Sequence, residues 1–215
     1  MNIYVNPSRE QWSALCRRAE QDNSLIAERV EAIVERVREQ GDKALFALAE
    51  EIDGVTLNSL QVSAEEFSAA ESAVSSEVKT AIEVAVSNIE AFHRAQLPRE
   101  VKVETQEGVE CLQRPVPIRR VGLYIPGGTA PLFSTVLMLA LPARIAGCEQ
   151  VVLCTPTNKQ GCVAAEVLYA AHRCGVTTVY KVGGAQAIAA MAYGTASVPK
   201  VDKIFGPGNR YVTLA

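Results

Sequence analysis

The second half of the chain alternates apolar segments with helical patterns four times in succession. Strand-like apolar runs occupy residues 120–125, 150–154, 177–182 and 201–205, and helix-like stretches follow at 132–145, 163–174, 184–194 and from 210 onward. Strands that alternate with helices form a parallel sheet, because a helix carries the chain from the end of one strand back to the start of the next. Each such helix covers one face of the sheet. The pattern therefore predicts an α/β fold, in which a parallel sheet carries flanking helices.

The turns between these strands and helices are the predicted binding site. They lie at residues 126–131, 155–157, 183–186 and 206–209, and three of the four are rich in glycine. Ligands of open parallel sheets bind beyond the carboxyl ends of the strands, and the first N–H groups of a helix favour phosphate oxygens. We expect a phosphate-bearing cofactor on a partial Rossmann-like sheet. Each turn alone also fits simple chain reversal, and neither G-x-G-x-x-G nor a P-loop pattern is present.

Residues 1–98 carry a helical period instead. Apolar residues at positions 26, 30, 33, 34 and 37 form one stripe, Arg29 and Arg36 fall on the polar side, and Gly41 ends the pattern. Ser63 and Glu66 form a capping-box signature, and residues 76–96 repeat with a period near 3.6. We expect a helical region, 1–98, with a role in dimerisation or packing, and a second region, 99–215, that opens with an antiparallel hairpin over residues 101–113.

Composition excludes several classes of partner. The chain has 215 residues, is 48% hydrophobic and has a net charge of -3, so it lacks the broad basic field that attracts nucleic acid or anionic membranes. Its longest apolar stretch, residues 132–145, is shorter than the ~20 residues that a bilayer span needs. The first residues lack the basic and apolar regions of a secretion signal. We therefore expect a cytoplasmic protein with neither nucleic acid nor membrane as partner.

Three longer motifs identify a family. They are VGLYIPGGTAPLFSTVLM at 121–138, VGGAQAIAA at 182–190 and VPKVDKIFGPGN at 198–209. Together with GDKAL at 41–45 and IEAFH at 89–93, these motifs closely resemble histidinol dehydrogenase. The resemblance implies an NAD-dependent zinc enzyme of histidine biosynthesis, which oxidises L-histidinol to L-histidine through the aldehyde and is a homodimer. It makes region 99–215 the NAD-binding half.

The same resemblance implies three NAD contacts. Carried over by motif, they are Tyr124, Gln186 and Asn209, and all three lie at the turns that the sheet argument selects. Tyr124 also fits a half-buried strand aromatic, and Asn209 fits a helix cap, a role that can coexist with ligand binding. Gln186 and Asn209 offer paired donor and acceptor atoms for ribose hydroxyls or an amide.

In the family, the zinc ligands and the catalytic Glu-His pair lie beyond the part that this chain resembles. We therefore expect no catalytic and no metal-ligating residue here, and an amino-terminal portion, truncated at its carboxyl end, that is inactive alone. The two histidines, His93 and His172, lack ligand spacing, which favours surface positions. The alternative is a folded, non-catalytic fragment that acts only as an interaction or structural module.

The cysteines suggest a third, weaker hypothesis. Six cysteines are irregularly spaced and contain no C-x-x-C pair, so neither a disulfide framework nor a zinc knuckle is predicted. Cys154 ends a strand near the predicted site, where a thiolate could attack an aldehyde. Core filling is the competing interpretation, since no neighbouring base or helix amino terminus lowers the pKa of its thiol.

Overall fold

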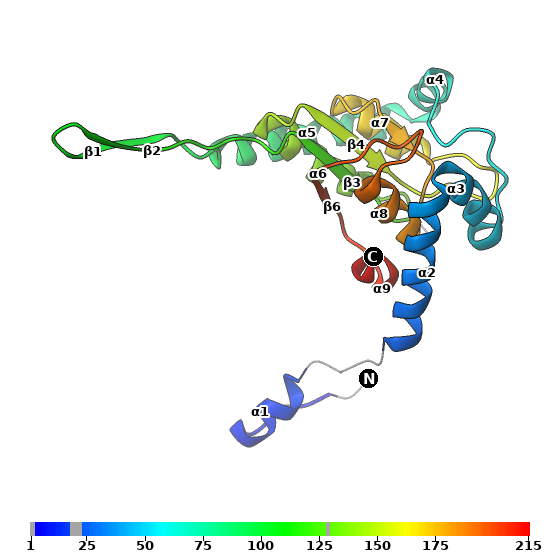
Figure 1. Cartoon of the computed structure of the whole chain (residues 1–215), viewed down its shortest axis with the longest axis horizontal. Helices are drawn as coiled ribbons and strands as arrows, with labels where there is room; N and C mark the ends of the chain where they lie inside the picture. The colour runs from blue at the N-terminus through cyan, green and yellow to red at the C-terminus, as the bar shows by residue number, and fades with distance from the viewer. Residues whose placement is uncertain (1–2, 18–22, 128–129) are drawn as a thin grey trace.

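The computed structural model describes residues 3–17, 23–127 and 130–215, and its centre is a parallel sheet of four strands (Figure 1). The strands run in the order β5-β4-β3-β6. Their bounds are Arg120–Tyr124 for β3, Gln150–Cys154 for β4, Val179–Tyr180 for β5 and Lys203–Phe205 for β6. The predicted α/β class and parallel sheet are confirmed, although β5 and β6 are shorter than the apolar runs that predicted them.

Helices cover both faces of this sheet. After each strand the chain forms α6 (Phe133–Ala146), α7 (Ala165–Arg173), α8 (Gly184–Tyr193) and α9 (Arg210–Leu214). Strand side chains alternate between the faces: Leu123 and Leu153 join the core with α6 and α7, whereas Tyr124 and Cys154 join the core with α8. This period of two lets both faces of β3 and β4 be buried, as parallel sheets require.

The described residues of the range 1–98 form helices, as predicted. They form α1 (Arg9–Leu15), α2 (Ser24–Gln40), α3 (Asp42–Leu48), the π-helix η1 (Ala49–Asp53), α4 (Ala64–Ala73) and α5 (Ser76–Ala95). The capping box is present, since Glu66 N–H donates to Ser63 Oγ at 3.2 Å and Ser63 N–H donates to the Glu66 carboxylate at 2.9 Å. Gly41 ends α2 with a positive φ. The helical stretch that follows Gly41 changes from the α-helix α3 to the π-helix η1 at Ala49 and ends at Gly54.

These helices pack directly on the sheet layer. Helix α2 lies on α8, while α4 and α5 lie on α7 and α6. Both hydrophobic cores therefore combine residues from the ranges 1–98 and 99–215. Residues 60–62 also add an antiparallel partner to the β5 edge, because Val62 N–H donates to the Val179 carbonyl at 2.9 Å. The division into two regions at residue 98 stays a prediction.

A β-hairpin extends away from this body (Figure 1). Its strands, β1 (Val101–Gln106) and β2 (Val109–Gln113), pair antiparallel as predicted, and every residue in them is exposed. Among the described residues, no helix combines the length and apolarity that crossing a membrane requires.

Candidate functional site

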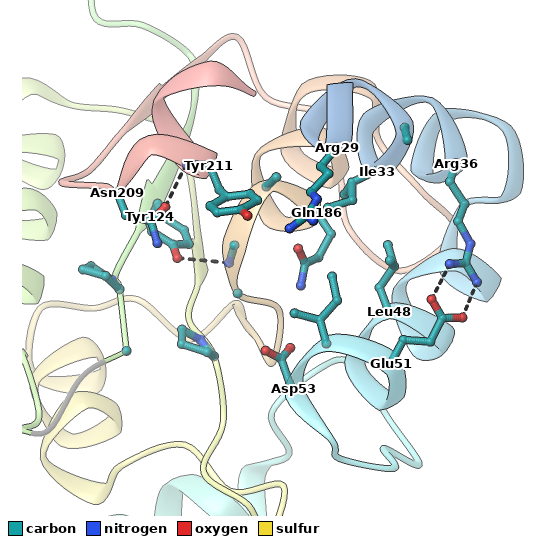
Figure 2. Close-up of a pocket in the computed structure, with 18 residues that line it drawn as sticks. Arg29, Ile33, Arg36, Leu48, Glu51, Asp53, Tyr124, Gln186, Asn209 and Tyr211 are labelled. Atoms are coloured by element: carbon teal, nitrogen blue, oxygen red, sulfur yellow. Dashed lines mark hydrogen bonds and ion pairs between the residues drawn. The ribbon is translucent and has the colours of Figure 1, made fainter. Parts of the chain in front are cut away.

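One cavity of about 680 Å³ lies at the carboxyl ends of the strands (Figure 2). Residues of α2, η1, the turns after β3, β4 and β5, and the start of α9 line it. Tyr124, Gln186 and Asn209 are all among its lining residues. The structure therefore brings the three predicted positions together from three separate strand-to-helix connections, as the topology of a parallel sheet implies.

Tyr124 is the last residue of β3 and is 4% exposed. Its hydroxyl oxygen accepts a hydrogen bond from the Gly184 N–H at 3.0 Å. Because burial raises the pKa of the Tyr124 phenol, the hydroxyl keeps its proton at neutral pH. The oxygen accepts this one hydrogen bond within the protein, and the hydroxyl proton is available as a donor to a ligand.

Gln186 lies in the first turn of α8 and is 3% exposed. Its side chain extends into the cavity in Figure 2, and its amide has no hydrogen-bond partner among residues 3–17, 23–127 and 130–215. The Gln186 amide can therefore both donate a hydrogen bond to a molecule in the cavity and accept one from it.

Asn209 caps α9, as the sequence predicted. Its Oδ1 accepts hydrogen bonds from the N–H groups of Tyr211 at 3.0 Å and Val212 at 3.3 Å. The carbonyl half of the amide is thereby fixed, and the Nδ2 group remains as a donor at the exposed rim of the cavity. Capping and ligand contact can use different atoms of this side chain.

The N-terminal helices contribute charged groups that sequence reasoning missed. Arg29 and Arg36, seven residues apart on α2, both line the cavity, as do Glu51 and Asp53 of η1. Arg36 donates two hydrogen bonds to the Glu51 carboxylate, at 2.6 and 2.8 Å, so its charge is matched (Figure 2). Arg29 forms no ion pair within the part of the chain that the structure describes. The seven-residue spacing was a usable signal that both arginines share one face of α2.

The glycines of the turns serve to pack the turns against one another. A Cβ at Gly127 would lie 2.7 Å from Pro156 Cγ, and a Cβ at Gly183 would lie 2.6 Å from Pro156 Cβ. Pro156, in the turn after β4, thus occupies the space between the turns that follow β3 and β5. Residues 128 and 129 of the predicted 126–131 turn lie outside the described residues.

The thiol of Cys154 is unsuited to nucleophilic attack. It is fully buried in the core with Tyr124 and Val152, and burial raises the pKa of the thiol far above its ordinary value. A buried thiol with a raised pKa is protonated and inaccessible, so the third hypothesis loses its nucleophile. His93 and His172 pack beside Phe92 and Phe67, at ring-centroid distances of 5.7 and 5.9 Å.

Metal-ligating side chains do not gather in this part of the protein. The described residues contain no group of three or more His, Cys, Asp or Glu side chains that could hold a metal ion. A structural zinc site needs four such ligands, and a catalytic site normally needs three. The described residues therefore do not fit a zinc ion.

Comparison with known proteins agrees with the geometry of this fold. The sequence model of the family described as histidinol dehydrogenase matches residues 16–215. The chain is 54% identical to a histidinol dehydrogenase of Bacteroides thetaiotaomicron over all 215 residues, which cover 50% of that relative. It is 55% identical over 206 residues to one of Haemophilus influenzae, covering 96% of this chain and 47% of that relative.

A solved structure extends the likeness to three dimensions. The crystal structure of histidinol dehydrogenase from Elizabethkingia anophelis superimposes with a TM-score of 0.93 at 45% identity, and the match covers 98% of this chain and 48% of that one. The chain thus spans about half the length of the relatives it matches. Sequence and fold agree along nearly all of its length, and the chain belongs to the histidinol dehydrogenase family.

Proposed function

We propose that this chain forms the NAD-binding part of an enzyme that oxidises L-histidinol to L-histidine through the aldehyde, a step of histidine biosynthesis. The observation that carries the proposal is the cavity that unites Tyr124, Gln186 and Asn209. Further support comes from the family membership and from the side chain of Gln186, which extends into that cavity. The cavity lies where parallel sheets bind nucleotides.

Each residue of the site would have a distinct task toward the dinucleotide. The Tyr124 proton and the Asn209 Nδ2 group would donate hydrogen bonds, and the Gln186 amide would donate and accept. Arg29 would face the pyrophosphate, because its guanidinium is the cavity-lining cation without an acidic partner among the described residues. NAD, when bound, supplies the hydride acceptor.

We assign no metal and no acid-base chemistry to this chain. Zinc in the family would need ligands that the described residues do not assemble. The proposal is therefore that residues beyond this half-length segment complete the enzyme, that the intact enzyme works as a homodimer, and that the 215 residues alone give no turnover.

One observation favours a second candidate, an interaction or structural module without useful NAD affinity. The β1-β2 hairpin exposes Val101, Val103 and Leu112, each about half exposed, on two strands whose outer edges have no partner strand among the described residues. Exposed apolar side chains on unpaired strands are typical of a surface that another chain covers.

Calorimetric titration of the 215-residue protein with NAD separates the two candidates. We expect saturable binding at millimolar affinity or better, weakened by about fivefold or more in Gln186→Ala and Asn209→Ala, because each change removes hydrogen bonds to the ligand. His172→Ala is the matched control, since His172 is exposed and does not line the cavity. Absence of binding in a folded protein would favour the interaction module instead.

A further inference from the structure

Asp53 is the cavity residue whose position the proposed function does not yet explain. It is the last residue of the π-helix η1, and Glu51, Ile52 and Asp53 all line the cavity. A π-helical turn is uncommon and is found disproportionately at functional sites. In Figure 2 the Glu51 carboxylate faces Arg36, whereas the Asp53 carboxylate lies on the Gln186 side of the cavity.

The backbone at Asp53 is held in place from the sheet side. Lys159, in the connection after β4, donates a hydrogen bond from Nζ to the Asp53 carbonyl oxygen at 2.7 Å. Gly54 then ends the π-helix in the left-handed region, at a φ of 66°. Asp53 is therefore anchored to the same set of strand-to-helix connections that carries Tyr124 and Gln186.

The carboxylate of Asp53 itself is free. It is half-buried, and neither a hydrogen bond nor an ion pair to its oxygens is present within residues 3–17, 23–127 and 130–215. Burial raises the pKa of Asp53, while the charge of Lys159 opposes the rise. In Figure 2 the Asp53 carboxylate and the Gln186 amide point toward the same part of the cavity.

Hydroxyl groups are the chemistry that suits this pair. A carboxylate accepts hydrogen bonds from both hydroxyls of a vicinal diol, and a nearby amide can complete the set. A phosphate at the same place would be repelled by the carboxylate. Arg36 is already hydrogen-bonded to the Glu51 carboxylate, so its positive charge does little to reduce that repulsion.

An aliphatic surface lies directly beside Asp53. Leu48 and Ile52, from the same turn, and Ile33 of α2 all line the cavity, and Ile52 is 53% exposed. An exposed isoleucine within a cavity offers a flat base a surface on which to be buried. This end of the cavity therefore combines an apolar surface for a nucleotide base with a hydrogen-bond acceptor for the hydroxyls of a sugar diol.

We propose that Asp53 accepts hydrogen bonds from the adenosine ribose hydroxyls of NAD and thereby excludes NADP, which carries a phosphate on the 2′ oxygen. The inference rests on the proposed function, because it assigns one end of the same dinucleotide. It makes Asp53 a specificity-determining residue, distinct from the three contacts that the family motifs indicate.

Titrations with NAD and with NADP, on the unmodified chain and on Asp53→Asn, test this assignment. We expect the unmodified chain to prefer NAD, and Asp53→Asn to lower NAD affinity about tenfold while NADP affinity rises, because the isosteric amide removes the charge. Asp53→Ser serves as a second variant if the amide impairs folding. Glu50→Gln is the control: it removes one negative charge from the exposed side of the same π-helix, without lining the cavity.

The outcomes separate this inference from the function on which it rests. If the chain binds NAD but both Asp53 variants keep the NAD-to-NADP preference of the unmodified chain, the role of Asp53 is wrong and the proposed function stands. An equal loss of both cofactors in the variants contradicts it as well, since the 2′ phosphate would then lie elsewhere. If the unmodified chain binds neither cofactor, both proposals fail together.

Discussion

The hydroxyl oxygen of Tyr124 accepts a hydrogen bond from the Gly184 N–H at 3.0 Å, and this bond links the end of β3 to the first turn of α8. Helix amino termini leave N–H groups without intrahelical partners, and Tyr124 satisfies one of them. The phenol therefore has two roles: it fixes the geometry between two turns, and its own proton is left as a donor for a molecule in the cavity.

Tyr124→Phe removes the hydroxyl, and with it both of these roles, but keeps the packing of the ring. The ring stays in the core, so we expect the free energy of unfolding to fall by only about 1 kcal/mol, the contribution of one hydrogen bond. NAD affinity should fall about threefold to tenfold, because the donor is lost. Chemical denaturation and calorimetric titration measure the two effects, and a variant that binds NAD as tightly as the unmodified chain would remove Tyr124 from the site.

Arg29→Gln should weaken NAD binding in a salt-dependent way. Arg29 lines the cavity and has no acidic partner in the described ranges, so its charge is available to a phosphate. We expect about a fivefold loss of affinity at low ionic strength and a smaller loss in high salt, because salt screens exposed charges. Titrations at two salt concentrations measure this. Arg38→Gln, on the same helix but outside the cavity, should change neither value.

The parts of this structure that depend on local sequence could be predicted from it. Helix α2, the capping box of α4 and strand β4 follow from apolar spacing and from short-range side-chain hydrogen bonds. The carboxyl-end location of the cavity followed from topology alone, since parallel strands place their exits at one edge.

The charged residues that line the cavity could not be predicted in the same way. Arg29 and Asp53 enter it because α2 packs across α8 and because η1 inserts an extra residue into a helical turn. The first is a contact between segments more than 140 positions apart. The second is a π-turn, which the spacing of apolar residues does not reveal. The pairing of residues 60–62 with β5 was missed for the same reason, because it joins distant segments.

The packing of Pro156 between two turns predicts a specific pattern of rescue. Gly127→Ala and Gly183→Ala should each lower the free energy of unfolding by about 1 to 3 kcal/mol, because each new methyl would overlap the proline ring. Pro156→Ala should relieve the Gly127 variant, whose methyl meets Pro156 Cγ at 2.7 Å but Cβ only at 3.7 Å. It should not relieve the Gly183 variant, whose methyl meets Cβ at 2.6 Å.

Denaturation of the single and double variants provides this double-mutant cycle. Equal rescue of both glycine variants by Pro156→Ala would show that the turns are displaced from the arrangement described above. If neither glycine variant is destabilised, the turns can shift to accommodate the added methyl group, and Pro156 does not set the distance between them.

Cys174, at the end of α7, should make the fold less stable in alkaline solution. Burial raises the pKa of its thiol from 9 to about 11, so the unfolded chain loses this proton first as the pH rises. The folded state then binds more protons, and its stability falls above the unfolded pKa, by about 1 kcal/mol between pH 8 and pH 10 from this group. Cys174→Ala should lose that part of the slope, while the other buried thiols and phenols act equally in both proteins. Urea denaturation at the two pH values measures the difference, and parallel stability curves would show that the Cys174 thiol is not desolvated in the native protein.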